Sequence, residues 1–395
     1  ISIIQYINAY KKVNLMKKVC VITGARSEYG LLRWVIDGID KDEDLQLQLV
    51  VTGGHLSPEQ GLTYQAIEED GYHIDEKVEM LLTSETSVGI SKSMGLCSIG
   101  MADTFNRLKP DMIVVLGDRY ELLPIVGTAL VMRIPVAHIS GGDITEGAID
   151  NEVRNAVTMM SALHFPGTEE SAARIRAMRQ SLDNIYVTGE TNLDNFRKIE
   201  LLNRLQLAES LKIDPAKKWI LGTYHSETTL SVPENIQRVN NLLASLEKEC
   251  TDCEILFTKA NSDIGGNLIN DILQQYAEEK DNFHFVASLG QKRYISILYQ
   301  VIMMVGNSSS GIFETPFVKL PVLNIGDRQK GRLITSNIKC CDGTELGMQN
   351  ALKELQTEEF HNKCKMADNP YGDGHASERI VEQIKCYLND SDTLL

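Results

Sequence analysis

Short runs of consecutive apolar residues recur along the chain, and a stretch of helix length separates each run from the next. Runs rich in Val and Ile are typical of strands covered on both faces of a parallel sheet. In the first half, the runs start at Lys18 and then cover Leu45 to Thr52, Asp111 to Leu116, Ile134 to Ile139 and Ile185 to Val187. In the second half, they start at Trp219, Glu254, Asn282, Ile302 and Leu320. The alternation predicts an α/β fold with two Rossmann-like, doubly wound parallel sheets.

The two series of strands predict two domains, residues 16–190 and residues 191–370. Open parallel sheets bind ligands at the carboxyl ends of their strands, so we expect an interdomain cleft to hold the ligand.

The two ends of the chain have separate interpretations. Residues 371–395 contain an amphipathic stretch with Ile380 and Ile384, which predicts a C-terminal helix that returns to the N-terminal domain. We interpret residues 1–15 as an upstream extension, because Met16 and the two lysines after it have the form of a bacterial start.

Composition narrows the class of protein. The 395 residues include 39 Lys and Arg against 54 Asp and Glu, and a net charge of -15 opposes binding to nucleic acid. Apolar stretches fall short of the ~18–20 residues that span a bilayer, so we expect no membrane partner. The eight cysteines are scattered, without the spacing of a zinc site, which indicates reduced thiols in the cytoplasm and no metal.

Two turns rich in small residues follow predicted strands. Residues 24–27 read Gly-Ala-Arg-Ser, and backbone N–H groups there, with Arg26, can hold a phosphate at a helix N-terminus. Residues 306–311 read Gly-Asn-Ser-Ser-Ser-Gly, which predicts an anion-binding turn, and Glu314 in the following helix can accept both hydroxyls of a ribose. Neither turn matches a dinucleotide or ATP-binding motif, so we expect no cofactor.

Acidic and cationic residues gather after further strands. Asp118 follows one strand, Asp143 follows the next, and Asp150 comes shortly after it, with Glu146, Glu152 and Arg154 nearby. Carboxylates that share one crevice can differ in pKa and carry out separate acid and base steps. On the second domain, His225, Asn261 and Arg328 stand at strand ends and are candidates for phosphate or sugar contacts.

At these positions the chain resembles the hydrolysing UDP-N-acetylglucosamine 2-epimerases that begin bacterial sialic acid synthesis. The resemblance runs from about Lys17 to about Tyr387 and rests on TGARSEYG, VTGGHLS, LGDRYE, HISGGDITEGAID, GNSSSGIFE, NIGDRQKGR and NPYGDGHASERI, in that order. It implies a fold of the glycosyltransferase B type, with UDP bound mainly by the second domain and the sugar on the side of the first.

The resemblance also implies roles for single residues. Ser308 and Ser309 match diphosphate-binding serines, Glu314 a ribose-binding acid and His225 a catalytic histidine. Asn261 and Arg328 match nucleotide contacts, Arg26 a phosphate contact, and Asp118 and Asp150 acids of the chemistry. Many relatives carry a Glu at the place of Ser140, and we expect Asp143 to take over its role.

The reaction implied is elimination followed by hydration. A base removes the C2 proton while UDP leaves C1, which gives a 2-acetamidoglucal; water then adds at C1 and an acid protonates C2 from the opposite face. The products are UDP and N-acetylmannosamine. We expect Asp118 and Asp143 to transfer the protons and Asp150 to activate or place the water.

Four alternatives stay open from the sequence. One is the same reaction on UDP-N,N'-diacetylbacillosamine, on the way to legionaminic acid. The second is a non-hydrolysing 2-epimerase, the third a glycosyltransferase of the same fold, and the fourth a nucleotide-sugar sensor without catalysis. Relatives imply a homodimer or homotetramer.

Overall fold

The structure, a computed structural model, describes residues 16–84, 86–144, 149–261 and 263–391. The predicted upstream extension and Glu146 lie outside these residues. The chain folds into two compact units: unit 1 extends to Asp194 and takes up the chain again from Tyr371, and unit 2 runs from Asn195 to Pro370. Among the described residues, no helix has both the length and the apolar character needed to cross a bilayer.

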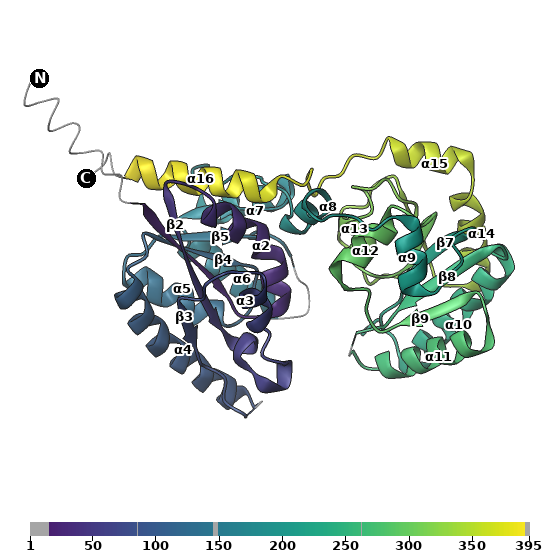
Figure 1. The fold of residues 1–395 in the computed structure, drawn as a ribbon, viewed down its shortest axis with the longest axis horizontal. Coiled ribbons are helices and arrows are strands. Elements are labelled where there is room, and N and C mark those ends of the chain that lie inside the picture. The colour runs from purple at the N-terminus through teal and green to yellow at the C-terminus, as the bar shows by residue number, and fades with distance from the viewer. Residues whose placement is uncertain (1–15, 85, 145–148, 262, 392–395) are drawn as a thin grey trace, which may run out of the picture. The chain divides into compact units, whose positions relative to one another are not determined.

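Unit 1 contains a six-stranded parallel sheet in the order β3-β2-β1-β4-β5-β6 (Figure 1). Its strands are β1 (Lys17–Thr23), β2 (Leu45–Thr52), β3 (Glu76–Val78), β4 (Met112–Leu116), β5 (Val136–Ile139) and β6 (Leu163–Phe165). Its helices are α2 (Arg26–Asp40), α3 (Gln65–Glu69), α4 (Ser87–Leu108), α5 (Leu122–Val131), α6 (Asp150–Met160), α7 (Glu169–Arg179) and α16 (Ala376–Ser391), with short 3₁₀ helices η1 (Gly53–Leu56), η2 (Pro58–Gln60) and η3 (Thr191–Asp194).

Helices cover both faces of this sheet. Alternate residues of each strand point to opposite sides, so each strand contributes to two cores. Val19 and Val21 of β1 pack with α2 and α16, while Cys20 and Ile22 pack with α4, α5 and α6. Helix α16 lies against α2 and contributes Ile380 to the same core (Figure 1).

Unit 2 contains a second six-stranded parallel sheet, in the order β12-β11-β10-β7-β8-β9. Its strands are β7 (Lys218–Thr223), β8 (Cys253–Thr258), β9 (Phe283–Val286), β10 (Met303–Gly306), β11 (Val322–Ile325) and β12 (Ile338–Cys341). Its helices are α8 (Asn195–Lys198), α9 (Arg204–Leu211), α10 (Val232–Glu249), α11 (Gly266–Glu279), α12 (Gly290–Leu298), α13 (Ser310–Phe313), α14 (Glu345–Leu355) and α15 (Glu358–Lys365).

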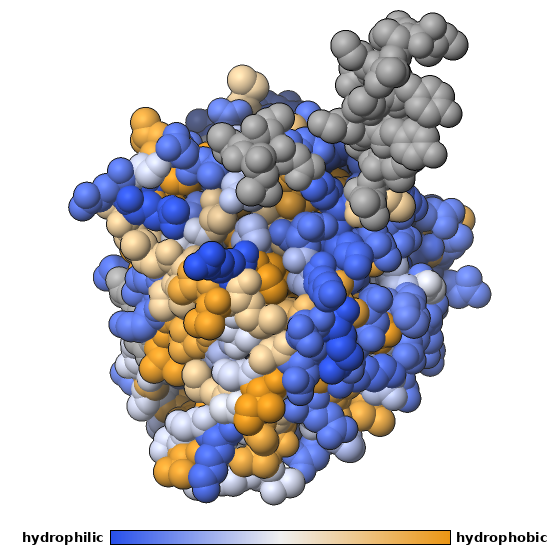
Figure 2. All heavy atoms as spheres, turned by 90° about the vertical axis from the view of Figure 1, so that its left-hand side faces the viewer, coloured by the Kyte–Doolittle hydropathy of each residue, from blue (hydrophilic) through white to orange (hydrophobic). Residues whose placement is uncertain are grey.

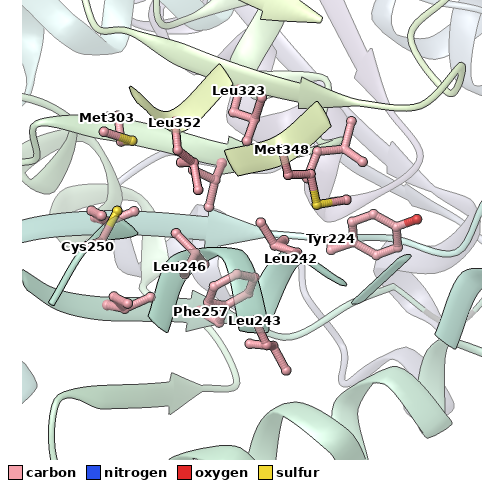
Figure 3. Packing of buried hydrophobic residues seen from close by; sticks show 14 of the residues in the cluster. Tyr224, Leu242, Leu243, Leu246, Cys250, Phe257, Met303, Leu323, Met348 and Leu352 are labelled. Atoms are coloured by element: carbon pink, nitrogen blue, oxygen red, sulfur yellow. The ribbon is translucent and has the colours of Figure 1, made fainter. Parts of the chain in front are cut away.

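The core of unit 2 forms where α10 and α14 pack on the sheet. Figure 3 shows Leu242 and Leu246 of α10 beside Phe257 of β8, with Met348 and Leu352 of α14 close to Leu323 of β11. All of these side chains are buried. The predicted fold class, two doubly wound parallel α/β sheets, is confirmed.

One predicted strand is wrong. Residues 185–187 form no strand; Ile185 makes a single parallel bridge to His164. The strand that occupies this edge of the sheet is β6, which the sequence did not predict because its three residues include a buried histidine. The short strands β3 and β12, which carry Lys or Glu, were also missed.

Apolar side chains also reach the surface of unit 1. On α4, Ile99 is 66% exposed, and at the end of α5, Val131 is 83% exposed. Figure 2, which views the molecule from the side of these helices, shows apolar groups among hydrophilic ones. The expected homo-oligomer stays a prediction.

The buried histidine of β6 leads to a prediction on acid stability. Neither ring nitrogen of His164 has a hydrogen-bond partner among the described groups, and burial lowers its pKa to about 3, with Arg179 and His138 acting in the same direction. In the unfolded chain, His164 takes up a proton near the ordinary pKa of ~6.5, so the free energy of unfolding falls as the pH drops from about 6.5 toward about 3.

The His164→Leu variant tests this effect. Between pH 7 and pH 5 we expect its free energy of unfolding in urea to fall by about 2 kcal/mol less than that of the wild type. The matched control, His73→Leu at an exposed position, should behave like the wild type. Equal losses for wild type and His164→Leu would contradict the prediction.

Candidate active site

Each sheet reverses its winding direction once, and predicted site residues follow the strands beside that point. The reversal lies between β1 and β4 in unit 1, and between β7 and β10 in unit 2. When the order of the second sheet is read from β9 to β12, the two sheets have the same strand order. Doubly wound sheets bind ligands at this point, beyond the carboxyl ends of the strands.

In unit 1 the turn after β4 carries Asp118. Gly117 has a φ of 84°, which favours glycine, and it starts this turn. Arg154 of α6 is 7% exposed; it forms an ion pair with Asp118 and donates from Nη1 to the backbone oxygen of Asp143 at 2.8 Å. Burial raises the pKa of Asp118, and the charges of Asp150 and Asp143 add to the rise while Arg154 opposes it. The structure therefore brings the three predicted acids close enough for their charges to interact.

His138 of β5 supports the turn that carries Asp118, through a contact with Gly117. One ring nitrogen, Nε2, lies 2.8 Å from the backbone oxygen of Gly117, and Nδ1 lies 3.2 Å from Oγ1 of Thr158. Burial lowers the pKa of His138 to about 4, so the ring is neutral at pH 7. A neutral ring can satisfy both neighbours only if Nε2 donates to the carbonyl and Nδ1 accepts from Thr158. His138 is thus a structural support for the turn that holds Asp118.

Asp143 is held by the start of α7. Ser171 donates from Oγ to Oδ1 of Asp143 at 2.5 Å, and Thr168 caps the helix by accepting the N–H of Ser171. Ser140 has a φ of 58°, and its N–H donates to the backbone oxygen of Phe165. That Asp143 replaces the Glu expected at Ser140 stays a prediction.

The contact between Ser171 and Asp143 can be tested directly. We expect Ser171→Ala to lower kcat about 10-fold, because Asp143 loses its fixed orientation together with a charge-assisted hydrogen bond. Steady-state turnover of the UDP-sugar that the resemblance implies measures the effect. Ser210→Ala, at an exposed position on α9, is the matched control and should leave kcat unchanged. A wild-type kcat in Ser171→Ala would show that this hydroxyl does not orient Asp143.

The turn after β1 differs from the predicted phosphate site. Gly24 and Ala25 donate their N–H groups to Oε2 of Glu28 at 2.6 Å and 3.2 Å. A carboxylate of the protein itself therefore takes up these two N–H groups at the N-terminus of α2, and the phosphate role of the turn at residues 24–27 stays a prediction. Arg26 is exposed at the start of α2 and stays a predicted phosphate contact.

In unit 2, His225 and Asn307 join the ends of β7 and β10. The N–H of His225 donates to Oδ1 of Asn307 at 2.7 Å, and Nδ2 of Asn307 donates back to the carbonyl of His225 at 2.8 Å. The N–H of Asn261 donates to Nδ1 of His225 at 3.1 Å, so the ring proton belongs on Nε2. Burial, and then the charge of Arg328, lowers the pKa of His225 to about 4. At pH 7, His225 is a neutral ring with Nε2–H as its donor.

Arg328 reaches the same place from the end of β11. Its Nη1 lies 3.3 Å from the backbone oxygen of Asn307, and Nε2 of Gln329 donates to that oxygen at 2.7 Å. Burial lowers the pKa of Arg328, while the charges of Asp263 and Glu227 oppose the change. The structure therefore brings these predicted residues together: His225 and Arg328 contact Asn307, and Asn261 contacts His225.

The serine-rich turn leads into a helix of only four residues, α13. Oγ of Ser308 and Oγ of Ser310 lie 2.9 Å apart, and Ser309 begins the helix without a side-chain cap. The helix ends at Phe313 and Glu314 caps it, whereas the sequence placed Glu314 one turn into the helix. Burial and the charge of Glu314 raise the pKa of Tyr294. The diphosphate and ribose roles of Ser308, Ser309 and Glu314 stay predictions.

Sequence reasoning missed Glu28, Ser171 and Gln329. Glu28 stands at the third position of α2, but the N-cap is Ala25, so the Ser or Thr that would complete a capping-box signal is missing from the sequence. Thr168 and the two glutamates after it mark the start of a helix, but they do not mark the contact that Ser171 makes. Nothing in the local sequence marks Gln329. Among the described residues, no three His, Cys, Asp or Glu side chains gather in a way that would hold a metal ion.

The two units and their switch points define the α/β two-domain fold of the glycosyltransferase B type. A family model described as UDP-N-acetylglucosamine 2-epimerase matches residues 37–385. The chain belongs to the UDP-N-acetylglucosamine 2-epimerase family.

Individual relatives cover nearly the whole chain. A hydrolyzing GDP/UDP-N,N'-diacetylbacillosamine 2-epimerase of Campylobacter jejuni is 39% identical over 345 residues, 87% of this chain and 88% of the relative. A hydrolyzing UDP-N,N'-diacetylbacillosamine 2-epimerase of Legionella pneumophila is 32% identical, over 94% of this chain and 96% of the relative. The structure of the Neisseria meningitidis UDP-GlcNAc 2-epimerase bound to UDP-GlcNAc superposes with a TM-score of 0.76 at 20% identity, and covers 93% of this chain and 99% of that one. This last likeness concerns the fold.

Proposed function

We propose that the chain is a hydrolysing 2-epimerase that converts a UDP-linked 2-acetamido sugar and water into UDP and the free 2-epimer. The observation that carries the proposal is the group of Asp118, Asp143 and Asp150 beside Arg154 at the strand ends of unit 1. The names of the Campylobacter and Legionella relatives support the hydrolysing branch.

The first half of the reaction is an elimination. One acid, in its carboxylate form, takes the proton from C2; the C2 electron pair forms the C1–C2 double bond, and the C1–O bond breaks with its electrons going to UDP. The second half is a hydration. Water bonds through its oxygen to C1 of the glycal and gives up one proton to a carboxylate, while an acid gives C2 a proton on the opposite face. Because the proton leaves one face and returns to the other, two acids are needed, and they must differ in protonation.

The surroundings of the acids fit these separate tasks. Asp118 is half-buried with a raised pKa and a guanidinium partner, while Asp143 has a hydroxyl donor from Ser171. We assign the proton transfers to Asp118 and Asp143 and the placing of water to Asp150, which is half-buried at the start of α6.

Unit 2 receives the leaving group. Neutral His225 offers Nε2–H, Arg328 offers a positive charge, and Ser308 and Ser309 offer hydroxyl groups. Donors that are already fixed stabilise the negative charge that develops on the diphosphate as the C1–O bond breaks. Asn261 and Glu314 complete the nucleotide contacts, and Arg26 of unit 1 is the remaining phosphate contact.

The sugar has two candidates. The names of the Campylobacter and Legionella relatives support UDP-N,N'-diacetylbacillosamine as the first. The description of the family model supports UDP-N-acetylglucosamine as the second, which was the first choice from the sequence. Legionaminic or sialic acid synthesis follows from the sugar and stays a prediction.

Comparing kcat/KM for the two sugars, measured by UDP release, decides between them. A ratio above about 10 in favour of one sugar identifies the substrate, because a polar substituent that the site does not pair costs at least that factor. Release of UDP from neither sugar would contradict the proposed function.

A further inference from the structure

A second group of charges lies at the switch point of unit 1. Glu28 of α2 and Glu121, just before α5, are 7% and 2% exposed. Arg119 faces both: its Nη2 is 2.5 Å from Oε1 of Glu121, and its Nε is 3.7 Å from Oε1 of Glu28. The guanidinium side chain is 41% exposed, so two buried carboxylates hold a cation that reaches solvent.

The two oxygens of Glu28 have different neighbours. Oε2 accepts the N–H groups of Gly24 and Ala25, while Oε1 faces Arg119. The carboxylate therefore connects the turn after β1 to the turn after β4, on the two strands that flank the switch point. Gly53 closes the space: a Cβ there would lie 3.0 Å from the backbone oxygen of Gly24 and 3.4 Å from Oε1 of Glu121.

Charge in this group comes from three side chains. Burial raises the pKa of Glu28 to about 7, and Glu121 adds to the rise while Arg119 opposes it. The other titratable neighbours are neutral at pH 7, because burial lowers the pKa of His55 to about 4 and raises those of Cys97 and Tyr120. Ionisation of Glu28 therefore adds a negative charge beside Glu121 and Arg119, and protonation of Glu28 removes it.

Arg119 is the neighbour of Asp118 in the chain, and its side chain is the link between this group and the catalytic turn. We propose that Glu28 is a positioning residue for the reaction: with Glu121 it holds Arg119, and through Arg119 it fixes the turn that carries Asp118. This inference rests on the proposed function, in which Asp118 transfers a proton. The ionised carboxylate holds Arg119 more firmly than the neutral acid, because only the anion attracts the guanidinium charge.

The first test compares Glu28→Gln with the wild type as the pH changes. Glutamine keeps an oxygen acceptor for the N–H of Gly24 but stays neutral, so it imitates the protonated glutamate. We expect kcat of the wild type to exceed that of Glu28→Gln about 10-fold at pH 8 and about twofold at pH 6. The affinity for UDP, measured by calorimetry, should be the same in both. Glu43→Gln, at an exposed position near the far end of α2, is the matched control and should follow the wild type at every pH.

A ratio that stays constant from pH 6 to pH 8 would show a merely structural role and overturn the proposal. A ratio of one throughout would overturn it too.

The second test does not depend on turnover. In protein labelled with 13C at the side-chain carboxyl of glutamate, the resonance that disappears in Glu28→Gln reports the ionisation of Glu28. We expect its midpoint to move down in Glu121→Gln, which removes a like charge, and up in Arg119→Gln, which removes the opposite charge. A midpoint that neither variant moves would overturn the proposal. If neither sugar turned over, the proposed function would fall, and this titration would still decide whether the three side chains act together.

Discussion

Replacing Asp118 by Asn is expected to lower kcat about 1,000-fold and to leave the affinity for UDP unchanged. Asparagine has the shape of aspartate but can neither take nor return a proton, so the variant loses the acid–base step alone. Arg154 loses its ion-pair partner, and its second contact, to the backbone oxygen of Asp143, remains. UDP release measures kcat, and calorimetry with UDP measures binding, which the proposal assigns to unit 2.

The control for this variant is Asp103→Asn. Asp103 is exposed on α4 of the same unit, so the same chemical change should leave kcat at the wild-type value. A kcat in Asp118→Asn within threefold of the wild type would remove Asp118 from the mechanism.

Replacing Gly306 by Ala is expected to destabilise unit 2 by about 4 kcal/mol and to abolish UDP binding. Gly306 ends β10 with a φ of 129°, and a Cβ there would lie 2.0 Å from the backbone oxygen of Thr223 on β7. Both the backbone conformation and the space require glycine. To relieve the clash between the added Cβ and Thr223, β7 and β10 would have to move apart, which would break the hydrogen bonds between His225 and Asn307.

The chain offers a reporter for each unit, since its two tryptophans are Trp34 in α2 and Trp219 in β7. In a Trp34→Phe background, the fluorescence of Trp219 follows the urea unfolding of unit 2. Gly95→Ala, in the interior of α4 with open space around its Cβ, is the control for unit 1. Followed by Trp34 in a Trp219→Phe background, it should stabilise unit 1 by about 0.5–1 kcal/mol. A wild-type unfolding midpoint for Gly306→Ala would contradict the steric argument.

The fold was predictable because most strands are runs of apolar residues that are buried on both faces. Leu45 to Thr52 was predicted with the bounds that β2 has in the structure. The strands β3 and β6 escaped prediction because they are three residues long and include charged residues or a histidine, and their pairing depends on neighbouring strands. Residues 185–187 have the pattern of a strand but lie where only one bridge forms.

The candidate site was predictable as a set of positions, and its contacts were not. Polar residues that follow buried strands indicated Asp118, Asp143 and His225, and the topology brings such strand ends to one edge of each sheet. The sequence of the turn at residues 24–27 does not show what its backbone N–H groups bind. A helix N-terminus attracts a phosphate or a nearby carboxylate, and in the structure the carboxylate of Glu28 accepts these bonds. Contacts such as Ser171 with Asp143 join positions 28 residues apart, which local patterns do not specify.

Proton NMR of the protein with each UDP-sugar in deuterated water tests the central claim most directly. The account predicts that UDP and the free 2-epimer form in equal amounts and that the product carries deuterium at C2, because the proton removed in the elimination is replaced from solvent. An equilibrium mixture of two intact UDP-sugars, or a free sugar that keeps its original hydrogen and configuration at C2, would contradict it.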